Sequence, residues 1–137
     1  MKLERIRYAN DKIVAFDQTW LPGSYGQLLF DEDLEHKTIY EILEEKYEIP
    51  ITAGSYTFTA VNATKEIAQH MGLGESAALL CIERCSKTLG NKHVYYQYRY
   101  LNPTFIRYEI ELNRDENSLH STKNGMPLKQ FVPRFSV

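Results

Sequence analysis

The chain has 137 residues, 43% of them hydrophobic, with a formal net charge of −2, which predicts one compact domain with an apolar core. A near-neutral charge and the lack of any Lys or Arg run argue against unaided nucleic-acid binding. No apolar run approaches the ~20 residues of a membrane span, and the first residues lack the apolar stretch of a signal peptide. These features predict a cytoplasmic protein that makes no contact with a membrane.

The first half of the chain predicts a hairpin followed by a helix. Residues 2–8 and 12–20 are expected to form two strands, because polar and apolar residues alternate and Asn10-Asp11 favours a tight turn. Residues 25–34 predict a loop or a short helical turn. Thr38 and Glu41 then form a capping-box pattern, which predicts a helix from Thr38 to about Lys46 or Tyr47.

The second half predicts four more elements and a polar extension. They are a strand over 51–61, a helix from Thr64 to Gly72, a hairpin of 77–89 and 92–101 around Gly90-Asn91, and a strand over 105–112. Residues 115–137 are polar and predict a surface extension, whose end is expected to dock through Phe131, Val132 and Phe135. Hairpins imply antiparallel pairing, so the predicted class is α+β, with an antiparallel sheet and helices packed on one face.

A segment near the start of the chain is repeated about eighty residues later. Leu3-Glu4-Arg5-Ile6 matches Ile82-Glu83-Arg84-Cys85 at an offset of 79, and residues 12–21 match residues 92–101 at an offset of 80. The pattern predicts two copies of one hairpin unit. Because only the second copy follows a helix and a Gly-rich turn, we expect the chain to lack the front end of a longer protein.

Two arginines on the first predicted strand are the clearest candidate for a binding site. Period-2 alternation places Arg5 and Arg7 on one face, where two forked guanidiniums can hold one phosphate or carboxylate. The alternative is that both arginines pair with acids at a sheet edge, such as Asp17, Glu83 or Glu111. The predicted helix start at Thr38 adds free amides and the positive end of a helix dipole, both of which favour an anion.

Several motifs carry a resemblance to a known family. Residues 3–11, the exit Trp20-Leu21-Pro22, and residues 38–43, 66–73 and 80–84 resemble the UTRA effector-binding domain of HutC-type regulators in the GntR family. The resemblance spans about residues 2–112. It implies a chorismate-lyase-like fold, a small-molecule site between sheet and helices, and homodimers that bind DNA only through an N-terminal winged helix-turn-helix domain. Family domains also begin with a further strand and helix before the position of Leu3, which we expect this chain to lack together with the winged helix-turn-helix domain.

The resemblance also implies which residues bind the effector. Members that sense phosphorylated sugars use positions that correspond here to Arg5, Arg7, Thr38 and Tyr40, and Asp17 stands where an acidic residue meets sugar hydroxyls. The second hairpin departs from that pattern, since Tyr95 stands where such members often carry a Glu. Gln97 and Arg99 share its strand face and are predicted substitutes.

Other functions remain open at the level of the sequence. The four histidines show no metal-ligand spacing, so no metal or cofactor is expected. Cys81 and Cys85 lie roughly 13 Å apart on one predicted strand, too far for a disulfide, and are predicted free thiols. The alternatives to a sensor are a free-standing lyase-type enzyme using Asp17 or Glu83 as its acid, and a dimerisation module with a vestigial pocket.

Overall fold

The computed structural model describes residues 1–114 and the backbone of residues 130–135. Within this part of the chain, contacts group the residues into two units. In the sequence, the first unit ends at Asn102 and the second begins at Pro103.

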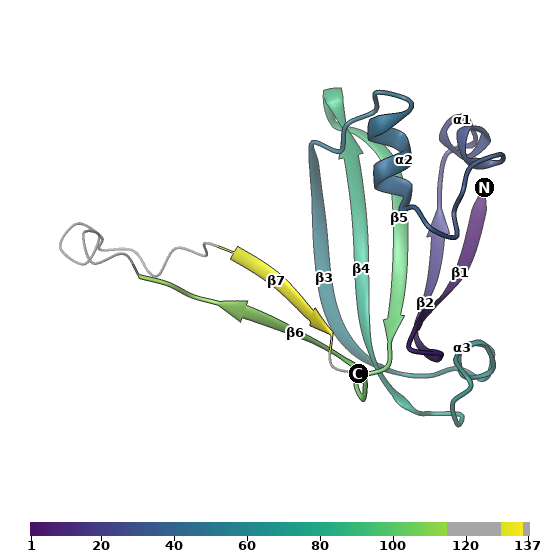
Figure 1. Cartoon of the computed structure of the whole chain (residues 1–137), viewed down its shortest axis with the longest axis vertical. Coiled ribbons are helices and arrows are strands. Elements are labelled where there is room, and N and C mark those ends of the chain that lie inside the picture. The colour runs from purple at the N-terminus through teal and green to yellow at the C-terminus, as the bar shows by residue number, and fades with distance from the viewer. Residues whose placement is uncertain (115–129, 136–137) are drawn as a thin grey trace. The chain divides into compact units, whose positions relative to one another are not determined.

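The first unit contains a five-stranded antiparallel sheet in the order β1-β2-β5-β4-β3 (Figure 1). Its strands are β1 (Lys2–Ala9), β2 (Lys12–Trp20), β3 (Ala53–Asn62), β4 (Ala78–Thr88) and β5 (Lys92–Leu101). Asn10 and Asp11 turn from β1 into β2 with φ of 48° and 62°, the left-handed values that a two-residue hairpin turn requires. The predicted α+β class and both predicted hairpins are confirmed.

Short helices connect the strands. They are α1 (Gly23–Gly26), η1 (Gln27–Leu29), α2 (Ile39–Glu45), α3 (Lys65–Met71) and η2 (Leu89–Asn91). The segment 25–34, predicted as a loop or a helical turn, contains the end of α1 and all of η1. α2 and α3 begin after Thr38 and Thr64, as predicted, because each threonine hydroxyl accepts a hydrogen bond from the third backbone amide of its helix.

The two longer helices pack on opposite faces of the sheet. Ile42 and Leu43 of α2 join Val94 and Tyr95 of β5 in one buried cluster, and Figure 1 shows α2 lying over β5. α3 packs instead against Phe16, which also stacks on His70 at a ring-centroid distance of 4.5 Å. Phe16 projects away from the face that carries Asp17 and the α2 cluster, since neighbouring residues of a strand alternate. The sequence predicted both helices on one face and did not foresee this division.

The repeated segments form equivalent hairpins related by a local two-fold axis. One copy is β1–β2 and the other is β5–β4, and the two join through antiparallel pairing of β2 with β5. Gln18 pairs with Tyr98, its own equivalent at an offset of 80. The axis therefore passes between these two residues.

The second unit contains a two-stranded antiparallel sheet of β6 (Ile106–Glu111) and β7 (Gln130–Phe135). In register, Ile106 lies opposite Phe135 and Glu111 opposite Gln130. The sequence predicted β6 but placed no strand in the polar extension, where β7 forms. The predicted docking by Phe131, Val132 and Phe135 concerns side chains outside the described residues.

The cap of α3 gives a direct test of how this helix is held. Thr64 Oγ1 accepts from the Ile67 amide at 3.3 Å, so Thr64→Ala is expected to lower the free energy of unfolding by about 1 kcal/mol. Thr64→Ser keeps the acceptor and is expected to remain within about 0.5 kcal/mol of the parent. Urea unfolding of both variants measures the difference, and equal losses would show that the hydroxyl contributes no cap.

Candidate functional site

One face of the sheet, here called the site face, carries a set of guanidiniums beneath α2. Arg5 lies opposite Asp17, which lies opposite Arg99 on β5. A cavity of about 270 Å³ opens above this face. Its lining comes from β1, β4, β5 and the start of α2 and comprises Arg5, Arg7, Thr38, Ile39, Tyr40, Arg84, Tyr95, Gln97 and Arg99.

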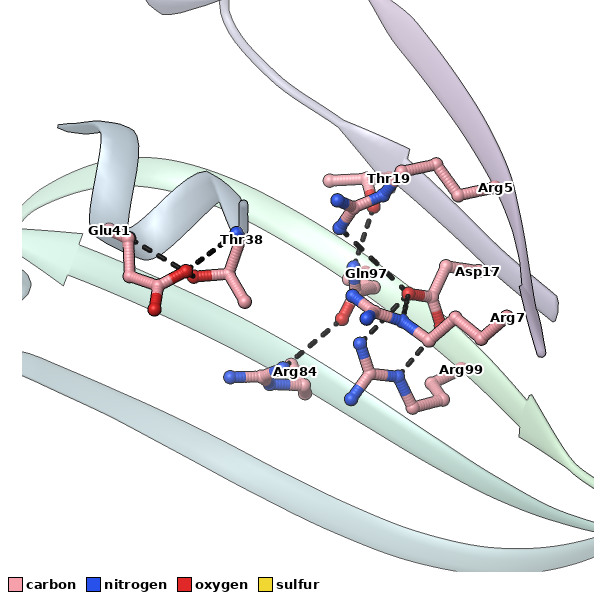
Figure 2. Close-up of polar contacts among 9 residues, drawn as sticks. All are labelled: Arg5, Arg7, Asp17, Thr19, Thr38, Glu41, Arg84, Gln97 and Arg99. Carbon is pink, nitrogen blue, oxygen red and sulfur yellow. Dashed lines mark hydrogen bonds and ion pairs between the residues drawn. The ribbon is translucent and has the colours of Figure 1, made fainter. Parts of the chain in front are cut away.

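Asp17 is the carboxylate that holds the guanidiniums together (Figure 2). Arg99 donates to it twice, Nε to Oδ1 at 2.7 Å and NH2 to Oδ2 at 2.8 Å, and Arg7 Nε donates to Oδ2 at 2.8 Å. The Asp17 side chain is 0% exposed. Burial alone would raise its pKa, but the bonds and charges of Arg99 and Arg7 outweigh that effect and lower the pKa below its ordinary value.

Arg5 is the least compensated member of this group. Its NH2 lies 3.9 Å from Asp17 Oδ2, its side chain is 13% exposed, and its buried Nε has no hydrogen-bond partner in the structure. Burial, followed by repulsion from Arg7, lowers the pKa of Arg5 to about 10. A guanidinium resists deprotonation, so this shift indicates a cation held in an unfavourable environment that an added anion would improve.

Gln97 and Arg84 occupy the neighbouring part of the site face. The buried Gln97 amide is fixed on both sides, since its Nε2 donates to Thr19 Oγ1 at 2.7 Å and its Oε1 accepts from Arg84 NH1 at 3.3 Å. Arg84 NH2 donates to the Tyr56 hydroxyl at 2.8 Å, and the guanidinium lies 4.8 Å from the Tyr56 ring centroid. Its Nε is buried without a partner.

The start of α2 forms the opposite wall. Thr38 is already engaged, because its amide and hydroxyl both donate to Glu41 Oε2 at 2.8 Å and its Oγ1 accepts from the Glu41 amide at 3.1 Å. The amide that the sequence offered to an anion is thus taken by Glu41. Tyr40 is 42% exposed, and a hydrogen bond with Glu44 raises its pKa. Its hydroxyl therefore stays protonated and donates its hydrogen to Glu44.

The structure brings seven of the eight predicted site residues to one cavity wall. The eighth, Asp17, lies beneath the wall with no exposed surface. Pairing of the arginines with acids, the alternative considered above, holds for Asp17. Glu83, by contrast, accepts a hydrogen bond from Tyr96.

Arg84 and Ile39 line the cavity but were not predicted. Arg84 had a signal in the sequence, because the repeat makes it the equivalent of Arg5 at an offset of 79. Ile39 had no signal in the sequence other than its position next to Thr38.

The described residues contain neither a cluster of metal-ligand side chains nor a membrane-spanning helix. Residues 1–114 contain no group of three His, Cys, Asp or Glu side chains placed to hold a metal ion. Among the helices in the described residues, none has the length and apolar character needed to cross a membrane.

Comparisons with known proteins agree on the fold. The family model described as the UTRA domain matches residues 1–120. Among solved structures, the ligand-binding domain of a putative GntR-family regulator from Bordetella bronchiseptica is 24% identical, with a TM-score of 0.73, covering 82% of this chain and 70% of that one. A GntR-family regulator from Enterococcus faecalis is also 24% identical, with a TM-score of 0.68 and coverage of 82% and 79%.

A more distant neighbour is the C-terminal domain of PhnF, 15% identical with a TM-score of 0.67, covering 74% of this chain and 64% of that one. No curated protein sequence matches significantly.

The ion pairs of Asp17 predict how stability depends on pH. The folded pKa is lowered, so this carboxylate stabilises the fold above its unfolded pKa of ~3.9, and the contribution is lost as the pH falls through the folded value. Asp17→Asn is expected to lower the free energy of unfolding by about 2–4 kcal/mol at pH 7, because it leaves guanidiniums uncompensated.

Denaturant unfolding at pH 7 and at pH 3 measures this effect. The gap between Asp17→Asn and the parent should narrow at the lower pH. Asp11→Asn removes the same charge from an exposed turn and should change the free energy of unfolding by less than about 0.5 kcal/mol. Equal stability of Asp17→Asn and the parent at pH 7 would contradict the role of Asp17.

Proposed function

The chain belongs to the UTRA domain family, and from this premise we propose that it is the effector-sensing domain of a HutC-type, GntR-family transcriptional regulator in the cytoplasm. The effector is a small anionic metabolite, with phosphorylated sugars as the leading class. The likeness to GntR-family ligand-binding domains supports the proposal at the level of the fold.

The main observation in favour of an anionic ligand is the charge imbalance around Asp17. Arg5, Arg7 and Arg99 surround one carboxylate at the wall of an open cavity. The carboxylate neutralises one of the three charges. A phosphate would supply acceptors and negative charge where the buried Arg5 Nε has no partner.

Each predicted residue takes a role that fits its place. Arg5 and Arg7 clamp the anion, and Arg99 adds positive charge from β5. Asp17 positions the arginines from below, since it has no surface with which to touch a ligand. The cavity wall of Thr38, Tyr40, Tyr95 and Gln97 meets the uncharged part of the effector.

Regulation follows from where the cavity lies. Its wall joins β1 to the start of α2, so a ligand that binds one arrangement of these elements more tightly shifts the population toward it. In the complete regulator, a homodimer would convert this shift into a change in DNA binding by N-terminal winged helix-turn-helix domains.

A lyase-type activity has less support. It needs an acid at the anion site, and the two candidates are Asp17 and Glu83. Neither lines the cavity, Asp17 is bonded to arginines, and Glu83 accepts from Tyr96.

Binding of sugar phosphates tests the proposal directly. A thermal-shift screen should show stabilisation of roughly 2.7 kcal/mol at a ligand concentration of ~100 times the Kd. For a hit measured by calorimetry, Arg5→Ala or Arg7→Ala is expected to cost about 1.5–3 kcal/mol of binding free energy, since each removes a charge-assisted hydrogen bond.

The matched control removes a guanidinium elsewhere. Arg114 is exposed and does not line the cavity, so Arg114→Ala should bind with unchanged affinity. A hit whose affinity is the same in Arg5→Ala, Arg7→Ala and the parent would remove these arginines from the site. No stabilisation by any sugar phosphate would contradict the proposed effector class.

A further inference from the structure

Arg84 gives the cavity a second cationic region that the anion clamp does not use. Its side chain lines the same cavity as Arg5, and its described partners are Gln97 and Tyr56, both neutral. No carboxylate lies within ion-pair distance of Arg84 among the described residues. Arg5 and Arg84 are also the two residues whose buried guanidinium Nε atoms lack partners in the described structure.

The local two-fold axis explains why Arg84 is uncompensated. Arg5 and Arg84 are equivalent at an offset of 79, and Asp17 and Gln97 are equivalent at an offset of 80. The pairing is equivalent too, since Arg5 lies opposite Asp17 and Arg84 lies opposite Gln97. One copy of the hairpin therefore gives its arginine a carboxylate, and the other gives it an uncharged amide of similar shape.

The charges of the two hairpin copies then predict how much negative charge the ligand carries. In the described part of the chain, the cavity is lined by the guanidiniums of Arg5, Arg7, Arg84 and Arg99, and the carboxylate of Asp17 offsets one of these four charges. One phosphate carries ≈ −1.5 to −2 at pH 7 and leaves a cation unmatched. Arg84 is half-buried, and partial burial of a cation without a charged partner is unfavourable.

We propose that the effector carries two anionic groups, one held by Arg5 and Arg7 and the other, a carboxylate or a second phosphate, held by Arg84. This inference rests on the proposed function and narrows its ligand class. Arg84 is a specificity-determining residue in this reading, and the Gln97 amide orients it while contributing no charge.

The geometry suits a ligand with its charges at opposite ends. β1 and β4 are three strand spacings apart in the sheet, roughly 14 Å between backbones. Figure 2 shows Arg5 and Arg84 on opposite sides of Gln97. A short polyhydroxylated chain with an anion at each end therefore matches both the cavity of about 270 Å³ and the separation of the two arginines.

Three probes with one carbon skeleton test the inference by calorimetry. They are glucose 6-phosphate, gluconate, and 6-phosphogluconate, which carries a phosphate at one end and a carboxylate at the other. The doubly charged probe is expected to bind at least tenfold more tightly than either singly charged one. Fructose 1,6-bisphosphate shows whether a second phosphate serves as well as a carboxylate.

Variants then locate the second anion. Arg84→Gln should reduce the affinity for 6-phosphogluconate at least tenfold and change that for glucose 6-phosphate less than threefold, whereas Arg5→Ala should weaken both. Gln97→Glu gives the second hairpin copy a carboxylate at the position where the first copy has Asp17. It should therefore also lessen the advantage of the doubly charged probe, and circular dichroism checks that each variant is folded.

The outcomes separate the two proposals. If glucose 6-phosphate binds and neither doubly charged probe gains affinity, or if Arg84→Gln leaves the gain intact, the second anionic group is disproved and the anion sensor stands. If neither these phosphate-bearing probes nor any compound of the sugar-phosphate screen binds, both proposals fall.

Discussion

The buried carboxylate of Asp17 is the interaction on which the site depends. It is fully enclosed, yet it stays ionised because Arg99 and Arg7 donate to both of its oxygens. Without it, repulsion between the guanidiniums of β1 and β5, the strands that flank β2, would oppose both the local fold and the cavity. With it, the cluster is stable but remains positively charged. The single negative charge of Asp17 does not balance the guanidiniums around it. The site therefore remains positively charged and can accept a second anion.

The internal repeat shows how such a site arises from two similar hairpins. A symmetric pair of hairpins would place one arginine opposite one acid in each half. Here Asp17 has its equivalent in Gln97, while Thr19 has its equivalent in Arg99. The exchange moves a positive charge next to Asp17 and removes a negative charge from Arg84. A two-fold scaffold thereby becomes a polar cavity with two distinct cationic ends.

Much of this arrangement could be predicted from the sequence, because strand alternation fixes which side chains share a face. That rule, with the resemblance, put Arg5, Arg7, Gln97 and Arg99 together correctly. It could not give strand order, so the neighbours Asp17 and Arg99, which are 82 residues apart, were not foreseen as a pair. Strand β7 was missed because it follows a polar, punctuated segment and contains Pro133, a residue that argues against a strand. Arg84 was missed because the repeat was taken to predict two equivalent hairpins, and the equivalence of Arg84 with Arg5 was not applied to the binding site.

The start of α2 indicates how a ligand would act on this domain. A helix of seven residues is too short to be stable by itself, yet α2 has its own cap in Glu41 and an apolar face buried against Val94. Contacts within the described chain therefore hold α2 in place. An anion bound at Arg5 would relieve the unfavourable burial of that guanidinium, and it would favour the arrangement of β1 and α2 in which it binds most tightly.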